Sequence, residues 1–541
     1  MTTPILDSPR PPKGSFIARF LTFVEWLGNL LPHPVTLFAL FALAIVLISA
    51  VATWTGLSVN DPRPGNEGVV LTANSLLAPE GVRWMFQNIV PNFAGFVPLG
   101  TVLVALLGVG VAEKSGLLSA VIRGLILAAP PQMVTLVVVF AGVVSNTASE
   151  MGYVVIIPLA MAVFYALGRH PLAGMAAAFA GVSGGYSANI LVGTVDPLLA
   201  GITQEAARLV DPTYEVSPIA NYYFMAVSTI LVTLVGWIIT AKIIEPRLGE
   251  YNADEGEDSL EPATSMEKLT KLEKKGIKLA GLSVALLTLF IFVLAGPRVA
   301  FLQWANDIPF WGVLRNPDTS ITGPESFRPM LRSVVTMIFI AFVIPGFVYG
   351  KTVGVMKNDR DIIQAMDHAM RSMGLYIVLV FFAAQFVAFF NYSGLGQILA
   401  VMGADALVAM NLDNPLVFIP FILMCCFVNL MLGSASAQWA ATAPIFVPML
   451  MTIGYSPETI QAAYRIGDST TNIITPMMSY FGLILAIATR YKKDLGIGTM
   501  VATMLPYSIA LMFCWTILFY LWVFVFGLPV GPGSPTLYPA G

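Results

Sequence analysis

Residues 414–454 read NPLVFIPFILMCCFVNLMLGSASAQWAATAPIFVPMLMTIG, an apolar stretch that small and polar residues interrupt near its middle. A helix needs about 20 mostly apolar residues to cross a bilayer, so this stretch is too long for one crossing. The interruption, at 433–438, is GSASAQ. Backbone that leaves the helix at membrane depth must be buried by protein or face a wet cavity. The stretch therefore predicts a helical hairpin whose tip stops inside the membrane.

A second stretch of the same kind, residues 131–168, is interrupted at 145–149 by SNTAS. Around the two hairpins, further segments are long and apolar enough to cross a bilayer. These nine segments lie at 33–54, 94–113, 171–205, 220–244, 277–296, 331–350, 371–391, 458–489 and 499–527. The sequence thus predicts an all-α polytopic membrane protein with about nine transmembrane helices and two re-entrant hairpins.

The composition agrees with a bilayer environment. Of the 541 residues, 57% are hydrophobic and 11% are charged, whereas an average soluble domain has about 25% charged residues. The net charge of −3 indicates no polyanionic partner, so nucleic acid is not expected. The three cysteines lie in apolar stretches without metal-ligand spacing. We expect no cofactor apart from a coupling ion.

The two halves of the chain follow the same order of span, hairpin, interrupted span and span. If the hairpins enter from opposite faces, the halves form an inverted repeat, which is typical of secondary transporters. The predicted parts are a cytoplasmic arm (1–32), a first span with an outside loop (33–93), repeat 1 (94–244), a cytoplasmic loop with scaffold spans (245–370), repeat 2 (371–527) and a tail (528–541). A short helix is expected near 264–275.

Basic residues indicate the orientation. With the N-terminus inside, 20 of the 28 Lys and Arg residues fall on the cytoplasmic side and 7 outside, and Arg465 lies within the membrane. This bias satisfies the positive-inside rule. It predicts a multi-pass inner-membrane protein with a cytoplasmic N-terminus.

Four ionisable residues fall at membrane depth, where they usually face a cavity or a partner. Arg465 and Asp468 are three positions apart on one helical face. They either pair with each other or act on a substrate, with Arg465 meeting an anion and Asp468 positioning it or carrying a proton. Asp196, between Gly193 and Pro197, either caps a helix at a break or lines the cavity. Glu150 either caps the helix that returns from the first tip or faces the cavity.

The tips and breaks carry side-chain oxygens and exposed carbonyls that suit Na⁺, and half-helix N-termini attract carboxylates. One predicted Na⁺ site combines Ser145, Asn146 and Asn189. Its counterpart combines Ser434 and Asn472, with Ser436 beside them. Close packing of helices by small residues is the alternative explanation.

Four segments resemble the AbgT family of p-aminobenzoyl-glutamate transporters and antimetabolite exporters. They are VEWLGNLLPHP (24–34), SNTASE (145–150), GSASAQW (433–439) and RIGDSTTN (465–472). The resemblance runs over nearly the whole chain. It implies a homodimer of nine-span, two-hairpin protomers that move p-aminobenzoyl-glutamate, p-aminobenzoate or folate-related compounds, and that in some members export sulfonamides.

Carried over by motif, the resemblance implies functional roles for a set of residues. They are Asp196, Ser436, Trp439, Pro457, Arg465, Asp468 and Pro476. Trp439 would stack on the aromatic ring of the substrate, although a lone tryptophan after a hairpin tip is more often a packing residue.

The leading hypothesis is a secondary transporter with either H⁺ or Na⁺ as coupling ion. A sodium-coupled dicarboxylate importer is the alternative within transport, and the aromatic Trp439 argues against it. No Walker A motif is present to support an ATP-driven pump. A channel would need a continuous polar path, and we recognise no nucleophile–base pair for an intramembrane enzyme.

Overall fold

The structure is a computed structural model, and it describes residues 32–61, 68–148, 152–252, 268–297, 308–318, 320–321 and 323–538. Ser149 and Glu150 therefore lie outside the described residues, as do the N-terminal arm up to residue 31 and most of the loop after residue 252. Except for one small hairpin of strands β1 (Ser58–Asn60) and β2 (Val70–Thr72), the regular structure is helical.

Seven spans cross as continuous helices or helix pairs. They are α2 (Pro34–Trp54), α3 with α4 (Pro79–Ala94 and Val97–Lys114), α10 (Tyr222–Ile239), α12 (Lys271–Leu294), α14 (Val334–Val353), α16 (Gly374–Tyr392) and α22 (Ile497–Tyr520). Two spans are interrupted. The first combines α8 (Pro171–Phe179) with α9 (Val195–Ala207), and the second combines α20 (Pro457–Asn472) with α21 (Phe481–Thr489). Together they make the nine spans that the sequence predicts.

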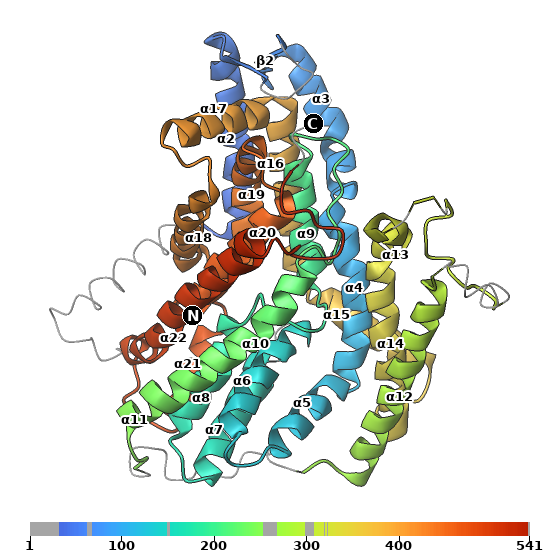
Figure 1. The fold of residues 1–541 in the computed structure, drawn as a ribbon, viewed down its shortest axis with the longest axis vertical. Helices are drawn as coiled ribbons and strands as arrows, with labels where there is room; N and C mark the ends of the chain where they lie inside the picture. The colour runs from blue at the N-terminus through green and yellow to red at the C-terminus, as the bar shows by residue number, and fades with distance from the viewer. Residues whose placement is uncertain are drawn as a thin grey trace, which may run out of the picture.

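Two hairpins complete the fold. The first consists of α6 (Val134–Ser145), the turn η1 (Asn146–Ala148), the π-helical segment η2 (Gly152–Ile156) and α7 (Ile157–Ala166). The second consists of η9 (Pro415–Val417) with α18 (Phe418–Leu432), and α19 (Ala435–Thr452). Figure 1 shows α6 and α7 in the lower half of the molecule and α18 and α19 in the upper half. This placement of the two hairpins in opposite halves of the molecule is what an inverted repeat predicts.

The helices divide into a supporting group and a central group. Helix α12 packs on α14, which packs on α4, and α2 packs on α16. In the centre, α10 lies against both α6 and α22, while α19 lies against α9. Helix α12 stands at the edge of the molecule in Figure 1, and almost none of its apolar length is buried by the rest of the chain. Its side chains are therefore available to lipid or to another copy.

Several elements differ from the sequence prediction. Residues 79–94 form helix α3 and not a loop, so the predicted outside loop at 55–93 is wrong in its second half. Its prolines misled the prediction, because Pro79 stands at the start of α3, where a missing N–H costs nothing, and the helix continues through Pro91. The expected short helix near 264–275 is also wrong in its described part. Thr270 caps α12 through a capping box, and the helix then runs on without a break.

Smaller helices join the spans. They are α5 (Leu117–Leu127), α11 (Glu245–Leu248), α13 (Arg328–Arg332), α15 (Asp359–Arg371) and α17 (Leu395–Ala409), with short segments η3 (Ala180–Gly184), η4 (Thr240–Ile244), η8 (Gly323–Phe327) and η10 (Leu521–Val525). Arg328 and Arg332, both in α13, form ion pairs with Glu215 in the loop after α9, the first at 3.3 Å. Arg332 donates to Glu215 at 2.7 Å, and this hydrogen bond lowers the pKa of the Glu215 carboxyl.

Candidate substrate and ion site

Each hairpin tip packs against the break of the interrupted span in its own repeat. The first break, 185–194, follows the π-helical turn η3. Asn189 donates to the Thr147 hydroxyl at 2.8 Å, and Asn146 donates to the Gly185 carbonyl at 3.2 Å. These bonds hold the first tip and the first break together in the interior.

The second tip meets the second break, 473–480, in a matching way. Gly433 ends α18 with a φ of +55°, the left-handed conformation that glycine adopts without a penalty. A Cβ atom on Gly433 would lie 2.8 Å from the Met477 carbonyl oxygen, so only glycine fits this approach. Asn429 donates to the Asn472 side-chain oxygen at 2.9 Å, which ties α18 to the end of α20. The two repeats thus build the same junction.

A contact between the two junctions joins the halves. The Ser187 N–H, in the first break, donates to the Ser469 hydroxyl of α20 at 3.0 Å. Helix α20 is buried along its whole length, although its composition is strongly polar. Because a polar helix at membrane depth is costly, its side chains must find partners or ligands. It therefore forms the axis of the candidate site.

Arg465 pairs with Asp196 across the two repeats. Its Nη2 donates to Asp196 Oδ1 at 2.9 Å, and its Nε donates to Asn221 Oδ1 at 3.0 Å. The side chains of Arg465 and Asp196 are 2% and 8% exposed, so the pair is shielded from water. Asp196 also accepts from the Gly193 N–H at 2.9 Å, but the N-cap of α9 is Thr194 and no side chain caps it, so the helix-cap alternative is wrong. The Asp196 side chain thus bonds the backbone of the first break and neutralises Arg465 at once.

Asp468 is not the partner of Arg465. Its side chain is fully buried, and both of its carboxylate oxygens lack a hydrogen-bond partner within the described part of the chain. The suggested mutual salt bridge is therefore wrong. The helical spacing puts both residues on one face, but tertiary packing aims Arg465 at Asp196 of the other repeat. A buried carboxylate without a partner needs a proton, a cation or a ligand.

Unpartnered oxygens gather around the tips and breaks. Besides Asp468, the described residues include Asn146 Oδ1, Ser187 Oγ, Asn429 Oδ1 and Gln438 Oε1 as buried atoms without a hydrogen bond. Oxygen atoms of this kind are the ligands that hard cations use. The donor set around Asn429 and Asp468 fits a monovalent cation or a proton as the group that completes it.

The predicted Na⁺ ligands are only partly brought together. Asn146 and Asn189 lie in one junction, but the Ser145 hydroxyl donates to the Gly142 carbonyl of its own helix at 2.6 Å. Asn472 lies in the other junction. Ser434 is half-buried at the start of α19. Of the first predicted site these contacts join Asn146 and Asn189 but not Ser145, and of its counterpart none of them joins Ser434 to Asn472.

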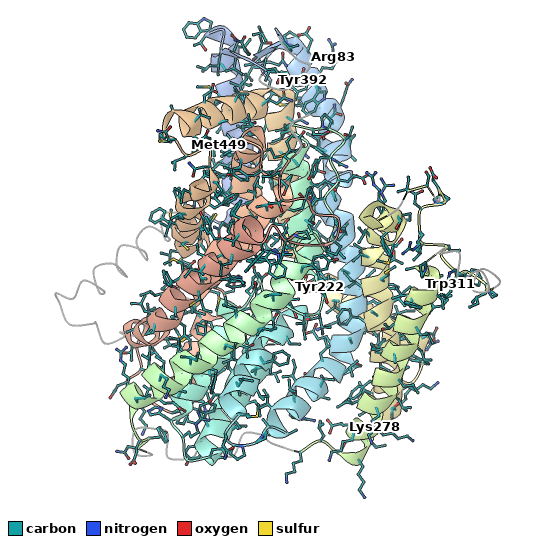
Figure 2. The ribbon with its side chains drawn as sticks, in the orientation of Figure 1. Arg83, Tyr222, Lys278, Trp311, Tyr392 and Met449 are labelled. Carbon is teal, nitrogen blue, oxygen red and sulfur yellow. The ribbon has the colours of Figure 1, made fainter. Side chains whose placement is uncertain are left out.

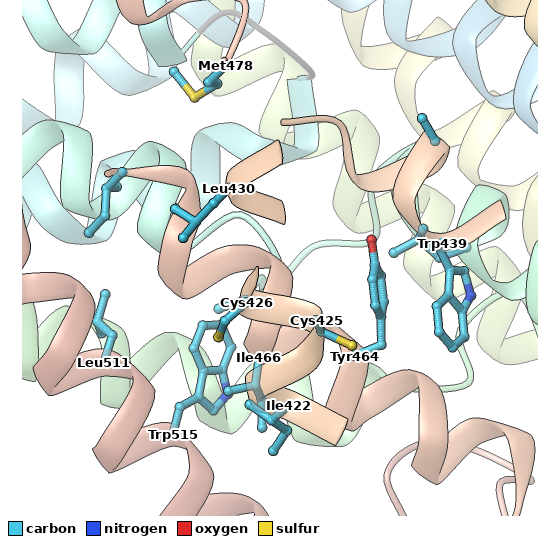
Figure 3. Close-up of a cluster of buried hydrophobic side chains, with 14 of the residues drawn as sticks. Ile422, Cys425, Cys426, Leu430, Trp439, Tyr464, Ile466, Met478, Leu511 and Trp515 are labelled. Atoms are coloured by element: carbon cyan, nitrogen blue, oxygen red, sulfur yellow. The ribbon is translucent and has the colours of Figure 1, made fainter. Parts of the chain in front are cut away.

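The ring and the indole N–H of Trp439, through which it could bind a substrate, both contact protein groups. Figure 3 shows the ring beside Tyr464. Its ring stacks on Tyr464 with centroids 4.2 Å apart, and its Nε1–H donates to the Thr203 hydroxyl at 2.8 Å. Thr203 also lies 2.7 Å from Gln461 Oε1 of α20. In this conformation Trp439 is a packing residue between α9, α19 and α20, and stacking on a substrate stays a prediction that needs Tyr464 to move.

The remaining predicted residues surround this centre. Pro457 is buried at the first turn of α20, and Pro476 is half-buried in the second break. Ser436 is half-buried in the first turn of α19. The break at the second tip covers only Gly433 and Ser434, so the expected six-residue interruption is wrong in length.

The site is closed in this conformation. A crevice too narrow to hold a water molecule reaches the ion pair, and Tyr222 at the start of α10 lines it (Figure 2). The other lining residues are Val192, Asp196, Pro218, Ile219, Asn221, Met225 and Arg465. A ligand the size of an aromatic acid therefore requires a movement of the helices around it, as alternating access does.

Sequence reasoning missed several residues of this centre. Asn429 is one; it is a lone amide within the apolar α18, and that isolation was a usable signal. Asn221, Thr203 and Gln461 gave no such signal, because only the packing of α9 on α20 and the hydrogen bond from Arg465 to Asn221 reveal their contacts.

A hydrolase-like motif has no hydrolase geometry. Gly181-Val182-Ser183-Gly184-Gly185 matches Gly-x-Ser-x-Gly, but it lies at a helical π turn and not at a strand-to-helix elbow. The Ser183 hydroxyl contacts the Met478 sulfur at 3.2 Å and no histidine.

Comparisons with known proteins agree with this architecture. The chain is 36% identical to the p-aminobenzoyl-glutamate transport protein of Escherichia coli (strain K12) over 528 residues, which is 98% of both chains. The solved structure of Neisseria gonorrhoeae MtrF, described among antimetabolite efflux pumps, superposes with a TM-score of 0.87 at 53% identity, covering 96% of this chain and all of that one.

The Alcanivorax borkumensis YdaH transporter, described as having an unusual topology, gives a TM-score of 0.82 at 44% identity, over 93% of this chain and all of the other. Residues 19–538 match the AbgT putative transporter family. The chain is accordingly a multi-pass membrane transporter and not an enzyme, and it belongs to the AbgT family.

Proposed function

We propose that this protein is a secondary active transporter of p-aminobenzoyl-glutamate and related aromatic carboxylates, and that it exports sulfonamide antimetabolites. The observation that carries the proposal is the buried Arg465–Asp196 pair between the two repeats, with the unpartnered Asp468 three residues away. A guanidinium recognises a carboxylate by paired hydrogen bonds. A substrate carboxylate can thus replace Asp196 at Arg465 when the site opens.

The coupling ion acts at Asp468 in this scheme. Binding of H⁺ or Na⁺ offsets the buried negative charge of Asp468, and the oxygens of Asn429 and Asn146 are free to add ligands to a metal cation. Because Asp468 and Arg465 share one helix face, a change of charge at Asp468 alters the hold of Arg465 on an anion. This supplies a physical link between ion and substrate.

The proposal includes the setting of the protein. In the inner membrane with a cytoplasmic N-terminus, the lower end in Figure 1 faces the cytoplasm, and α20 begins toward the outside. The family resemblance and the exposed apolar length of α12 support a homodimer.

The test uses purified protein in proteoliposomes. Labelled p-aminobenzoyl-glutamate is followed under an imposed pH gradient and, separately, under an imposed Na⁺ gradient, and sulfamethazine export is followed from preloaded vesicles. We expect one gradient to drive accumulation, and Arg465→Ala and Asp468→Ala each to abolish it while folded protein stays in the membrane. Retained transport in both variants would exclude the proposed site. Uptake of succinate in place of the aromatic substrate would favour a dicarboxylate carrier.

A further inference from the structure

Five polar residues form one continuous stripe along α20. Glu458, Gln461, Arg465, Asp468 and Asn472 recur at intervals of three and four, so they lie on a single face of the helix. All five are buried. A stripe of this kind through a membrane-spanning helix marks a path for an ion, a proton or a substrate. The proposed function uses its lower part, from Arg465 to Asn472, and leaves its first residue unexplained.

Glu458 is a second buried carboxylate without a countercharge. Glu458 is 2% exposed. Within the described part of the chain, no Lys, Arg or His forms an ion pair with it. It accepts a hydrogen bond from the Tyr214 hydroxyl at 2.9 Å. Burial and the adjacent carboxylate raise the pKa of Tyr214 far above its usual range, so Tyr214 stays neutral and keeps the proton that it donates to Glu458.

Glu458 is connected to the central site on one side. Asn221 donates through Nδ2 to the Glu458 carbonyl at 2.8 Å and accepts from Arg465 Nε through Oδ1 at 3.0 Å. One side chain thus touches both the turn that carries Glu458 and the Arg465–Asp196 pair. Glu458 and Asp468 are ten residues apart, about 15 Å along the helix.

On the other side, Glu458 is close to a wet surface. Arg208 donates to the Tyr214 carbonyl at 3.3 Å and lines a cavity of about 530 Å³. Asn92, Asn391 and Gln397 supply amide groups to the same wall, and Asn391 is exposed at the surface. This cavity therefore borders Arg208, which holds the backbone of Tyr214, the residue whose hydroxyl donates to Glu458.

We propose that Glu458 takes up and releases a proton during the transport cycle, as an outer proton site in series with Asp468. This rests on the proposed transport function. The carboxylate gains an O–H bond to a proton taken from water on the outer side, and it gives that proton to water in the opened site on the way to Asp468. No other group is oxidised or reduced.

The neighbourhood of Glu458 contains few competing groups. In the loop after α9, Tyr214 faces Glu458. Two further titratable groups lie near Tyr214: Asp211 in the same loop and Tyr538 in the C-terminal tail. Along α20 itself the next charged groups are Arg465 and Asp468. Asp211 and Tyr538 bear on Tyr214 rather than on Glu458, so Glu458 is the buried group whose charge can change here.

The competing explanation is structural. Glu458 stands in the first turn of α20, where Ser456 caps the helix and an acidic residue interacts favourably with the helix dipole. A purely structural Glu458 would affect stability and every mode of transport alike. A proton-carrying Glu458 would affect only transport that moves protons.

The decisive variant is Glu458→Gln, which keeps the size and the acceptor for Tyr214 but cannot change its charge. In proteoliposomes we expect exchange of p-aminobenzoyl-glutamate at equal pH to stay near the wild-type rate, while accumulation driven by a pH gradient falls about a hundred-fold or more. The matched control is Glu215→Gln, the same change one residue from Tyr214 in an exposed ion pair, which should leave both modes intact.

Two measurements guard against misfolding and against failure of the transport hypothesis. Infrared titration of the purified protein should show a protonated carboxylic acid band that disappears in Glu458→Gln and persists in Glu215→Gln. Tyr214→Phe, which removes one hydrogen bond from the ionised form, should move that titration to more alkaline pH.

If Glu458→Gln accumulates substrate like the wild type, loses exchange and accumulation equally, or leaves the infrared band unchanged, the proposal is overturned. Wild-type exchange with accumulation driven by Na⁺ alone would overturn it while leaving the transport function standing.

Discussion

The Arg465–Asp196 pair gives a prediction in which the loss of stability depends on which partner is removed. Asp196→Asn leaves a guanidinium that is 2% exposed and has no countercharge. Arginine cannot shed its proton in a protein. Removing one partner of a buried pair costs about 3–5 kcal/mol of unfolding free energy, and we expect Asp196→Asn to reach this range.

The reverse change should be milder. Arg465→Gln leaves the Asp196 carboxylate, which can accept a proton and still keep the bond from the Gly193 N–H. The double variant leaves no buried charge at this position. The structure therefore predicts that Asp196→Asn is the least stable of the three variants, and that adding Arg465→Gln to it recovers stability.

The assay is thermal unfolding of the detergent-solubilised proteins, read as an order of midpoints. Glu215→Gln is the control, because it breaks an ion pair in which the carboxylate is 38% exposed and should cost no more than about 1 kcal/mol. If Asp196→Asn unfolds at the wild-type temperature, or if the double variant is less stable than Asp196→Asn alone, the argument from buried charge fails.

Three further predictions concern single positions. Gly433→Ala should destabilise the protein by about 1–2 kcal/mol or more, since it adds a clash to a left-handed backbone. Gly454 also has a left-handed backbone but open space around it, so Gly454→Ala should cost only the backbone strain. Thermal unfolding midpoints compare the two variants. Trp439→Phe keeps a ring on Tyr464 but loses the bond to Thr203, which should cost about 1–3 kcal/mol by the same assay. The hydrogen bond from Arg332 lowers the pKa of Glu215. The ionised Glu215 carboxylate therefore stabilises the fold fully above about pH 4.5, and this effect is lost as the pH falls through the lowered pKa. The difference in unfolding midpoint between wild type and Glu215→Gln should shrink in acid and stay constant above neutrality.

The architecture could be predicted from the sequence because it depends on length and composition. The hairpin at 414–454 is too long for one crossing and carries a polar, small-residue interruption, and the structure turns at Gly433 within that interruption. The same logic failed at 79–94, where prolines suggested a loop. Proline at a helix start and proline in a loop look alike in sequence, and only the packing of α3 on α16 distinguishes them.

The site could be predicted as a set of residues but not as a set of pairs. Arg465, Asp468 and Asp196 stood out because each is ionisable at membrane depth. Local spacing favoured Arg465 with Asp468, whereas the structure pairs Arg465 with a residue 269 positions earlier. Spacing along a helix determines which residues share a face. It cannot determine what another repeat presents to that face.

That limit also explains why the two repeats must be considered together. Helix α20 is so polar that it could not remain in a membrane alone, and its partners come from the other repeat: Asp196 and Thr203 on α9, and Ser187 in the first break. Each half is therefore incomplete as a membrane structure without the other. A movement that separates the halves takes Arg465 and Gln461 from their partners and opens the face that carries Asp468, so water, ions or substrate must satisfy these polar groups. Under the proposed function, binding of an anion and its coupling ion must offset the free-energy cost of separating the two halves.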